Sequence, residues 1–146
     1  MVSVHDVARY FLSLADEEAG DLLSNLKLQK LCYYAQGFRL ALSGEPLYQE
    51  PIEAWTHGPV IPELYHAYKH HGSGAIELPT GFDVNVLPAD VRELLDEIYE
   101  VYGQYSAWKL RNMTHDEAPW MQAYQRGPSS VISTASLQEF FKTLVV

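Results

Sequence analysis

Apolar residues recur three and four positions apart through most of the chain, the spacing that gives an α-helix one apolar face. Residues that favour helix ends separate these stretches, with serine at several starts and glycine or proline at several ends. Together they predict seven helices, which begin after Ser3, at Ser24 or Asn25, at about Ile61, at Pro88, at Ala107, after the segment 114–117 and at Ser133. The pattern therefore predicts a mainly α fold.

Single residues place several helix ends. Gly44 is expected to end the second helix in a left-handed conformation, and Gly103 to end the fourth. The third helix is expected to end at His71 and the fifth at Asn112. The acidic segment 16–20 breaks the apolar pattern and predicts a loop between the first two helices.

Extended segments are expected in two places. Residues 47–56 have near-alternating apolar positions bounded by prolines, which predicts a short strand or an edge segment. Gly58 and Pro59 are expected to form the turn that follows. Residues 75–86 hold two further candidate extended pieces. The predicted architecture is a single compact multi-helix domain over 1–146 with a small β insert.

The sequence Thr-His-Asp-Glu at 114–117 matches a capping box, in which the first side chain bonds a backbone N–H and the last reaches back to the cap. We therefore expect Thr114 to cap the sixth helix and Glu117 to complete the box. Trp120 follows in the first turn and is expected to be a packed indole.

The charge balance limits the partners that the protein can have. The chain has 146 residues with 10 Lys and Arg against 19 Asp and Glu, a formal net charge of −9. Residues 45–146 carry six basic and fourteen acidic side chains, whereas residues 1–44 carry four and five. Nucleic-acid affinity depends on positive charge that neutralises phosphates, so no nucleic-acid partner is expected. An acidic exterior suits a basic protein partner instead.

The targeting features predict a cytoplasmic protein. The N-terminus has no basic segment followed by a long apolar run, so it is not expected to be a secretion signal. No stretch approaches the roughly 20 apolar residues that span a bilayer, so no membrane association is expected. Cys32 is the single cysteine and cannot form an internal disulfide.

Candidate catalytic and metal-binding residues are few. His66 and His70 lie four positions apart, as two zinc ligands on a helix would, but few acidic residues nearby could complete the site. Cys32 falls on an apolar helical stripe, where a thiolate would be poorly stabilised. We therefore expect no metal, no other cofactor and no catalytic residue from these patterns.

The chain is rich in aromatic residues, with 3 Trp, 10 Tyr and 5 Phe. Most should fill the core, but one helical stripe cannot bury all the tyrosines of the second and third helices, which are Tyr33, Tyr34, Tyr65 and Tyr68. Exposed tyrosine and tryptophan often anchor protein interfaces. We expect Tyr65 and Tyr68 to contribute to a partner-binding surface.

Three segments, in order along the chain, resemble those of a known family. They are LKLQKLCYYAQG at 26–37, EAWTHGPVIPELY at 53–65 and THDEAPW at 114–120. The chain thereby resembles the SocA-like antitoxin domain, also called the Panacea domain, whose members include phage-associated proteins of the GepA type. The resemblance implies an antitoxin that neutralises a toxin encoded nearby by direct protein contact. It also implies a bacterial protease complex as a partner, because the founding member delivers its toxin to a protease.

The matched motifs supply candidate partner-binding residues, although packing is the first role expected for most of them. Gly58 is expected to permit a close backbone approach, and Pro59 to fix the chain direction. The full candidate set is Lys30, Tyr34, Trp55, His57, Gly58, Pro59, Tyr65, Tyr68, Thr114, His115 and Trp120.

A small enzyme is the alternative that these residues leave open. His115 and His57, with nearby carboxylates in a cleft, would serve a hydrolase or a modifying enzyme as acid and base. The two hypotheses differ in stoichiometry, because a binding protein acts one to one on its partner and an enzyme acts on many substrate molecules.

Overall fold

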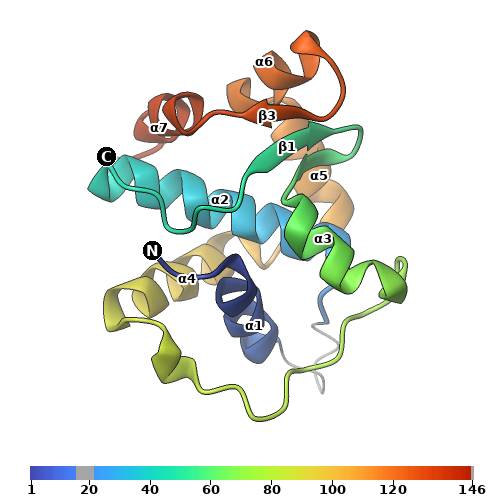
Figure 1. The fold of residues 1–146 in the computed structure, drawn as a ribbon, viewed down its shortest axis with the longest axis vertical. Coiled ribbons are helices and arrows are strands. Elements are labelled where there is room, and N and C mark those ends of the chain that lie inside the picture. The colour runs from blue at the N-terminus through green and yellow to red at the C-terminus, as the bar shows by residue number, and fades with distance from the viewer. Residues whose placement is uncertain (16–21, 146) are drawn as a thin grey trace.

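The computed structural model describes residues 1–15 and 22–145, so the loop expected at 16–20 lies outside the described residues. The described chain is mainly helical, which confirms the fold class (Figure 1). Its α-helices are α1 (Val4–Leu14), α2 (Asn25–Ser43), α3 (Pro62–Tyr68), α4 (Ala89–Tyr102), α5 (Ala107–His115), α6 (Ala118–Arg126) and α7 (Thr134–Lys142). The shorter elements are the 3-10 helices η1 (Lys69–His71) and η2 (Val84–Val86) and the strands β1 (Ile52–Trp55), β2 (Gly58–Val60) and β3 (Ser130–Ile132).

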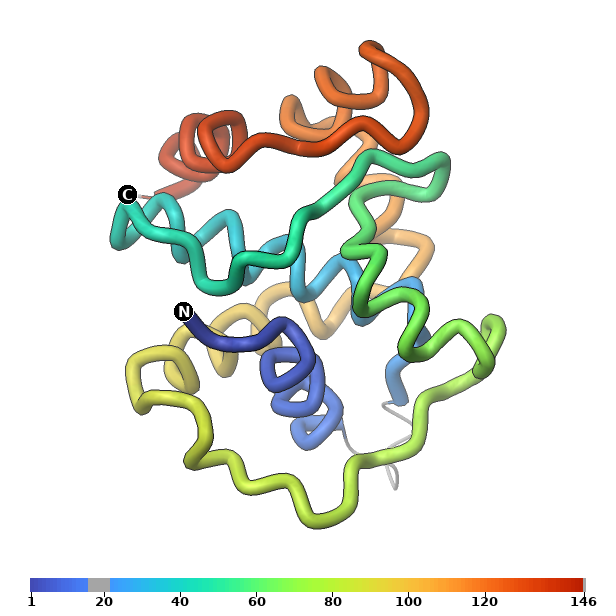
Figure 2. The backbone as a smooth tube through the Cα atoms, in the orientation of Figure 1, coloured from blue at the N-terminus to red at the C-terminus, as the bar shows by residue number. Residues whose placement is uncertain are grey.

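Helix α2 lies in the middle of the molecule. It packs against α1 and α4 on one side and against α5, α7 and β2 on the other (Figure 1 and Figure 2). Ser24 caps its start by accepting a hydrogen bond from the Lys27 N–H, and Gly44 ends it with a φ of 77°, as predicted. Because neighbours surround α2, Tyr33 and Tyr34 are both fully buried and neither faces outward.

Buried polar side chains of α2 hold neighbouring segments in place. The Gln36 amide nitrogen donates to the Tyr48 carbonyl at 2.7 Å, and its oxygen accepts from the Leu47 N–H at 2.7 Å. The Gln29 oxygen accepts from the Ile61 N–H at 2.9 Å, which fixes the chain where α3 begins. A buried polar group costs free energy unless it is hydrogen-bonded, so these bonds explain why glutamines are tolerated in the core.

The β insert is a three-stranded antiparallel sheet in the order β2-β1-β3. Strand β1 lies within the segment 47–56 that the alternating pattern indicates. Gly58 and Pro59 belong to β2 and not to a turn, because the tight turn of the hairpin is made by Thr56 and His57. The prediction of a Gly58–Pro59 turn is therefore wrong by two residues.

The segment 75–86 runs between α3 and α4 along the edge of the molecule (Figure 2). Its one pairing among the described residues is an isolated bridge between Ser24 and Ala75, and residues 84–86 form η2. The candidate extended pieces there do not become strands, because beyond that bridge they have no neighbouring strand to pair with.

The predicted end of α5 and the predicted capping box are both wrong. Helix α5 continues past Asn112 to His115, so Thr114 lies inside the helix. Its hydroxyl donates to the Arg111 carbonyl at 2.8 Å, a bond within one helical turn. Helix α6 begins after Glu117, whose side chain makes no cap.

Candidate functional site

Residues from α2, the β1–β2 hairpin and α5 meet at one place. We call it the hairpin corner, and it consists of Lys30, His57, Gly58, Trp108, Arg111, Thr114 and His115. Gly58 permits this meeting: its φ of 109° favours glycine, and a Cβ atom there would lie 2.7 Å from Lys30 Cε and 2.8 Å from Thr114 Oγ1. The close backbone approach expected at Gly58 is therefore present.

Lys30 is the buried cation of the hairpin corner. Its side chain is fully buried, and its Nζ atom has no hydrogen-bond partner among the described residues. Burial lowers the pKa of Lys30 from 10.5 to about 7, and the positive charge of Arg111 contributes to this shift. Both causes disfavour the charged form, so near neutral pH the amine is partly uncharged.

Helix α5 adds two further basic groups. Arg111 Nε and His115 Nε2 are buried, and neither has a hydrogen-bond partner in the part of the chain that the structure describes. Burial lowers the pKa of His115, and the positive charges of Arg111, Lys30 and His57 lower it further, whereas a hydrogen bond with the Thr56 backbone opposes the shift. The ion pairs found within residues 1–15 and 22–145 involve none of these four basic residues.

Aromatic and basic side chains form the exposed part of the hairpin corner. Trp108 is 54% exposed, with Arg111 Cζ 4.6 Å from its ring centroid and the His57 ring 5.7 Å away. Trp108, Arg111 and His115 lie three and four positions apart, which places them on one face of α5. Sequence analysis missed Trp108 and Arg111; that spacing would have indicated them if α5 had been expected to reach His115.

Trp120 connects α6 to the hairpin. Its ring stacks on His115 at 4.0 Å and on Tyr124 at 4.6 Å between centroids, and its Nε1 donates to the Trp55 carbonyl at 2.8 Å. The indole is buried, so Trp120 supports the hairpin corner from beneath and is not part of its exposed surface.

Glu117 is a second buried ionisable group, and it lies apart from the hairpin corner. Its carboxylate accepts hydrogen bonds from the Tyr33 hydroxyl at 2.9 Å and the Tyr34 hydroxyl at 2.8 Å. Burial raises the pKa of Glu117 to about 7, although both tyrosine hydrogen bonds oppose the shift. Tyr34 therefore pairs with Glu117, and its hydroxyl is not available to a partner.

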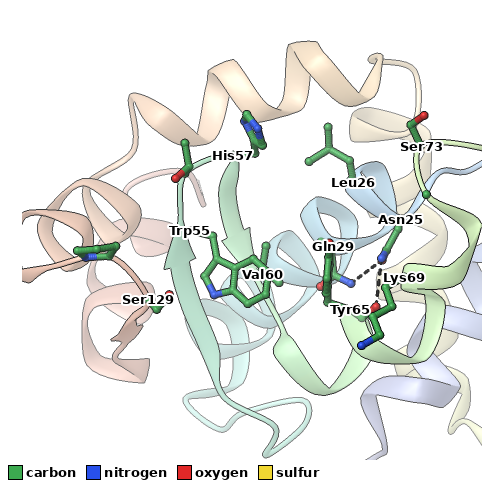
Figure 3. Close-up of a pocket in the computed structure, with 13 residues that line it drawn as sticks. Asn25, Leu26, Gln29, Trp55, His57, Val60, Tyr65, Lys69, Ser73 and Ser129 are labelled. Atoms are coloured by element: carbon green, nitrogen blue, oxygen red, sulfur yellow. Dashed lines mark hydrogen bonds between the residues drawn. The ribbon is translucent and has the colours of Figure 1, made fainter.

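A cavity of about 490 Å³ adjoins the hairpin (Figure 3). Its wall includes Trp55 and Tyr65, whose rings meet edge to face at 4.9 Å. Asn25 and Gln29 contribute polar atoms joined by a 2.8 Å hydrogen bond, drawn dashed in Figure 3. The volume lies within the range of small-ligand pockets, so the cavity is a second candidate contact site.

The remaining sequence candidates lie outside both sites. Tyr68 is half-buried and packs against the hydrophobic core, and burial raises its pKa. Pro59 is buried in β2 opposite Ala54. Of the two tyrosines expected as anchors on α3, Tyr65 lines the cavity and Tyr68 does not.

The structure places the candidate histidines in two separate regions. His57 and His115 do share the hairpin corner, but Glu117, the carboxylate two residues after His115, faces the two tyrosines. His66 lies in α3 and His70 in η1, so the two residues do not belong to one continuous α-helix. Among the described residues, no group of three His, Cys, Asp or Glu is placed to hold a metal ion.

No helix within residues 1–15 or 22–145 combines the length and the apolar composition of a membrane span.

Comparisons with known proteins find two similarities. A family model described as "Antitoxin SocA-like, Panacea domain" matches residues 28–121, which contain every residue of the hairpin corner. The curated protein Antitoxin SocA of Caulobacter vibrioides (strain NA1000 / CB15N) is 33% identical over 109 residues, covering 67% of this chain. The chain spans 58% of that relative's length. No solved structure matches.

Proposed function

The chain belongs to the SocA-like antitoxin family of Panacea-domain proteins, and from this premise we propose that it neutralises a toxin by direct protein–protein contact. The toxin is expected to be encoded nearby, and the contact to form in the cytoplasm. The family match over residues 28–121 is the observation that carries this proposal.

Two features of the surface support a binding role. The hairpin corner presents Trp108 beside Arg111, and tryptophan and arginine are among the residues that most often dominate interface energies. The adjoining cavity, with Tyr65 in its wall, offers a recess for a partner side chain.

The acidic surface supports a basic partner. Residues 45–146 carry fourteen acidic and six basic side chains, which gives them a net charge of −8. Charge complementarity mainly raises the association rate, whereas buried contacts set the lifetime of a complex. We therefore assign long-range steering to the acidic surface and retention of the toxin to the hairpin corner and cavity.

Co-expression with the product of the adjacent gene tests the proposal. If that product is toxic, growth should recover only when the antitoxin is supplied in at least equal amount, and the two chains should co-purify in a fixed ratio. Growth recovery with far less antitoxin than toxin, together with a covalently altered toxin, would favour the enzyme alternative.

Delivery of the toxin to a bacterial protease is a separate proposal that rests on the family resemblance. A pulse-chase measurement distinguishes it from simple occlusion. Delivery shortens the half-life of the toxin when the antitoxin is present, whereas occlusion leaves the half-life unchanged or lengthens it.

A further inference from the structure

We propose that Lys30 and Arg111 bind a carboxylate at the hairpin corner, beside His115. The carboxylate is either a free small molecule or an acidic side chain of a protein partner. The proposal does not depend on the antitoxin role, because it concerns a binding site of the isolated chain.

The first support is the contrast between Lys30 and the other buried polar side chains of α2. Lys27 Nζ donates to the Gly103 carbonyl at 2.6 Å, and Asn25 Nδ2 donates to the Tyr65 carbonyl at 3.2 Å. Gln29 and Gln36 are hydrogen-bonded as described above. Among the described residues, Lys30 is the one buried polar side chain of this helix whose charged group has no hydrogen-bond partner; Arg39 Nε also lacks one, but Arg39 Nη1 donates to Asp90 at 3.0 Å.

The second support is the accumulation of positive charge around Lys30. Arg111 lowers the pKa of Lys30, and both residues lower that of His115, so the three groups are close enough to repel one another. Arg111 is partly exposed and its Nη1 donates to Asn112 Oδ1 at 3.0 Å, whereas the Lys30 amine is fully buried. Burying that amine without a counter-charge is costly, and a bound anion would offset the cost. Glu117 is the buried acidic residue closest to His115 in the sequence. Its carboxylate already accepts hydrogen bonds from two tyrosines and does not serve as the counter-charge.

The donor atoms suit a carboxylate in particular. Lys30 Nζ and Arg111 Nε are two buried donors without partners, and a carboxylate has two oxygens to accept from them. The exposed side chains of His57 and Trp108 border the cluster. Phosphate carries more charge and more oxygens than these two donors require.

Nuclear magnetic resonance of the full chain with ¹³Cε-labelled lysine tests the proposal. Sodium acetate, sodium phosphate and sodium chloride are added separately at matched ionic strength, and a Lys30→Met variant assigns the Lys30 signal. Acetate should shift the Lys30 signal saturably and move its titration midpoint upward by about one pH unit or more. The exposed side chains of Lys69, Lys109 and Lys142 serve as internal controls.

Two results would overturn the site. One is a Lys30 signal that responds equally to acetate and chloride, and the other is a response shared with the three control lysines. Saturable binding of phosphate without acetate would overturn the assignment to carboxylates. Arg111→Gln should weaken acetate binding at least tenfold, whereas Arg9→Gln, at an exposed arginine on α1, should leave it unchanged.

A second measurement identifies the source of the carboxylate. If the toxin complex forms, the Lys30 signal is followed in that complex with and without acetate. A partner's acidic side chain is the source if the complex itself shifts the signal and acetate adds nothing; a free carboxylate is the source if acetate still binds. If no toxin complex forms, the acetate titration of the isolated chain still tests the proposed site.

Discussion

Two buried ionisable groups lie against the same helix, and their surroundings are opposite. Glu117 receives hydrogen bonds from the hydroxyls of Tyr33 and Tyr34, both carried by α2. Lys30, one turn earlier on α2, has no partner for its Nζ atom in the described structure and has Arg111 as a neighbouring like charge. The Glu117 site is complete within the chain, whereas the hairpin corner is not.

The difference separates a structural role from a binding role. A complete polar network stabilises one arrangement of the core, and its members gain nothing from an outside ligand. A buried group without a partner reduces stability, so a ligand that supplies the missing contact binds with a gain in free energy. Both sites contain motif residues, namely Tyr34 at the first and Lys30 at the second, but only the second is expected to change when a partner binds.

The largest expected effect is on Trp120, which lies on α6 and packs against the hairpin corner through His115. Trp120→Ala should lower the free energy of unfolding by about 3–5 kcal/mol, because it removes a buried indole stacked on His115 and bonded to Trp55. Denaturant unfolding measures the loss. Met121→Ala on the same helix is the control, since Met121 is exposed and should change stability by less than about 0.5 kcal/mol.

A loss below about 1 kcal/mol for Trp120→Ala would contradict its assignment as support for the hairpin corner. The stability of the hairpin corner would then not depend on the packing of Trp120 against His115.

The next effect is the change in the free energy of unfolding with pH, which should have opposite signs for Lys30 and Glu117. The pKa of Lys30 falls from 10.5 to about 7 on folding, so between these values the unfolded chain binds more protons and stability rises with pH. The pKa of Glu117 rises from 4.5 to about 7, so between these values the folded chain binds more protons and stability falls as pH rises. Each slope is at most about 1.4 kcal/mol per pH unit.

Two variants isolate these slopes. Lys30→Met should raise the free energy of unfolding at pH 7 by about 1–4 kcal/mol, and this gain should shrink as the pH rises from 7 toward 10.5, because deprotonating the wild-type amine then costs progressively less. Glu117→Gln should remove the decline between pH 4.5 and 7. Urea unfolding of the wild type and of each variant at pH 5, 7 and 9 measures both changes in unfolding free energy. A Lys30→Met gain that does not vary with pH would mean that the amine has its ordinary pKa.

The elements with local signals could be predicted from the sequence. Ser24 and Gly44 mark the ends of α2 because capping depends on a residue and its immediate neighbours. Strand β3 has three residues and is stabilised by pairing with β1, far away in the chain, so no local pattern indicates it. Thr114 resembles a cap by sequence but continues α5, because its hydroxyl bonds back to Arg111.

Five of the seven residues of the hairpin corner were among the candidates from the sequence, but Trp108, Arg111 and the arrangement of the site were not predicted. Lys30 and His115 belong to matched motifs, but a lysine in a helix is ordinarily solvated, so nothing in the sequence indicates a fully buried amine. Its burial follows from the meeting of α2, β2 and α5 at Gly58, which is a tertiary event.

The smallest expected effect on stability is at the exposed part of the hairpin corner. Trp108→Ala removes a half-exposed ring and its contact with Arg111, so it should cost less than about 1 kcal/mol of unfolding free energy. If the hairpin corner retains the toxin, the same variant should weaken capture about tenfold or more, because exposed tryptophan is a frequent interface anchor.

Val101→Ala supplies the matched control for Trp108→Ala. Val101 is 49% exposed, close to the 54% of Trp108, but lies on α4, on the other side of α2 from α5 (Figure 1). Denaturant unfolding and titration calorimetry with the co-expressed toxin should show similar stability for both variants and weaker binding for Trp108→Ala alone. Equal binding by the two variants would remove Trp108 from the interface. A stability loss of several kcal/mol for Trp108→Ala would instead make the hairpin corner a closed structural site, like that of Glu117.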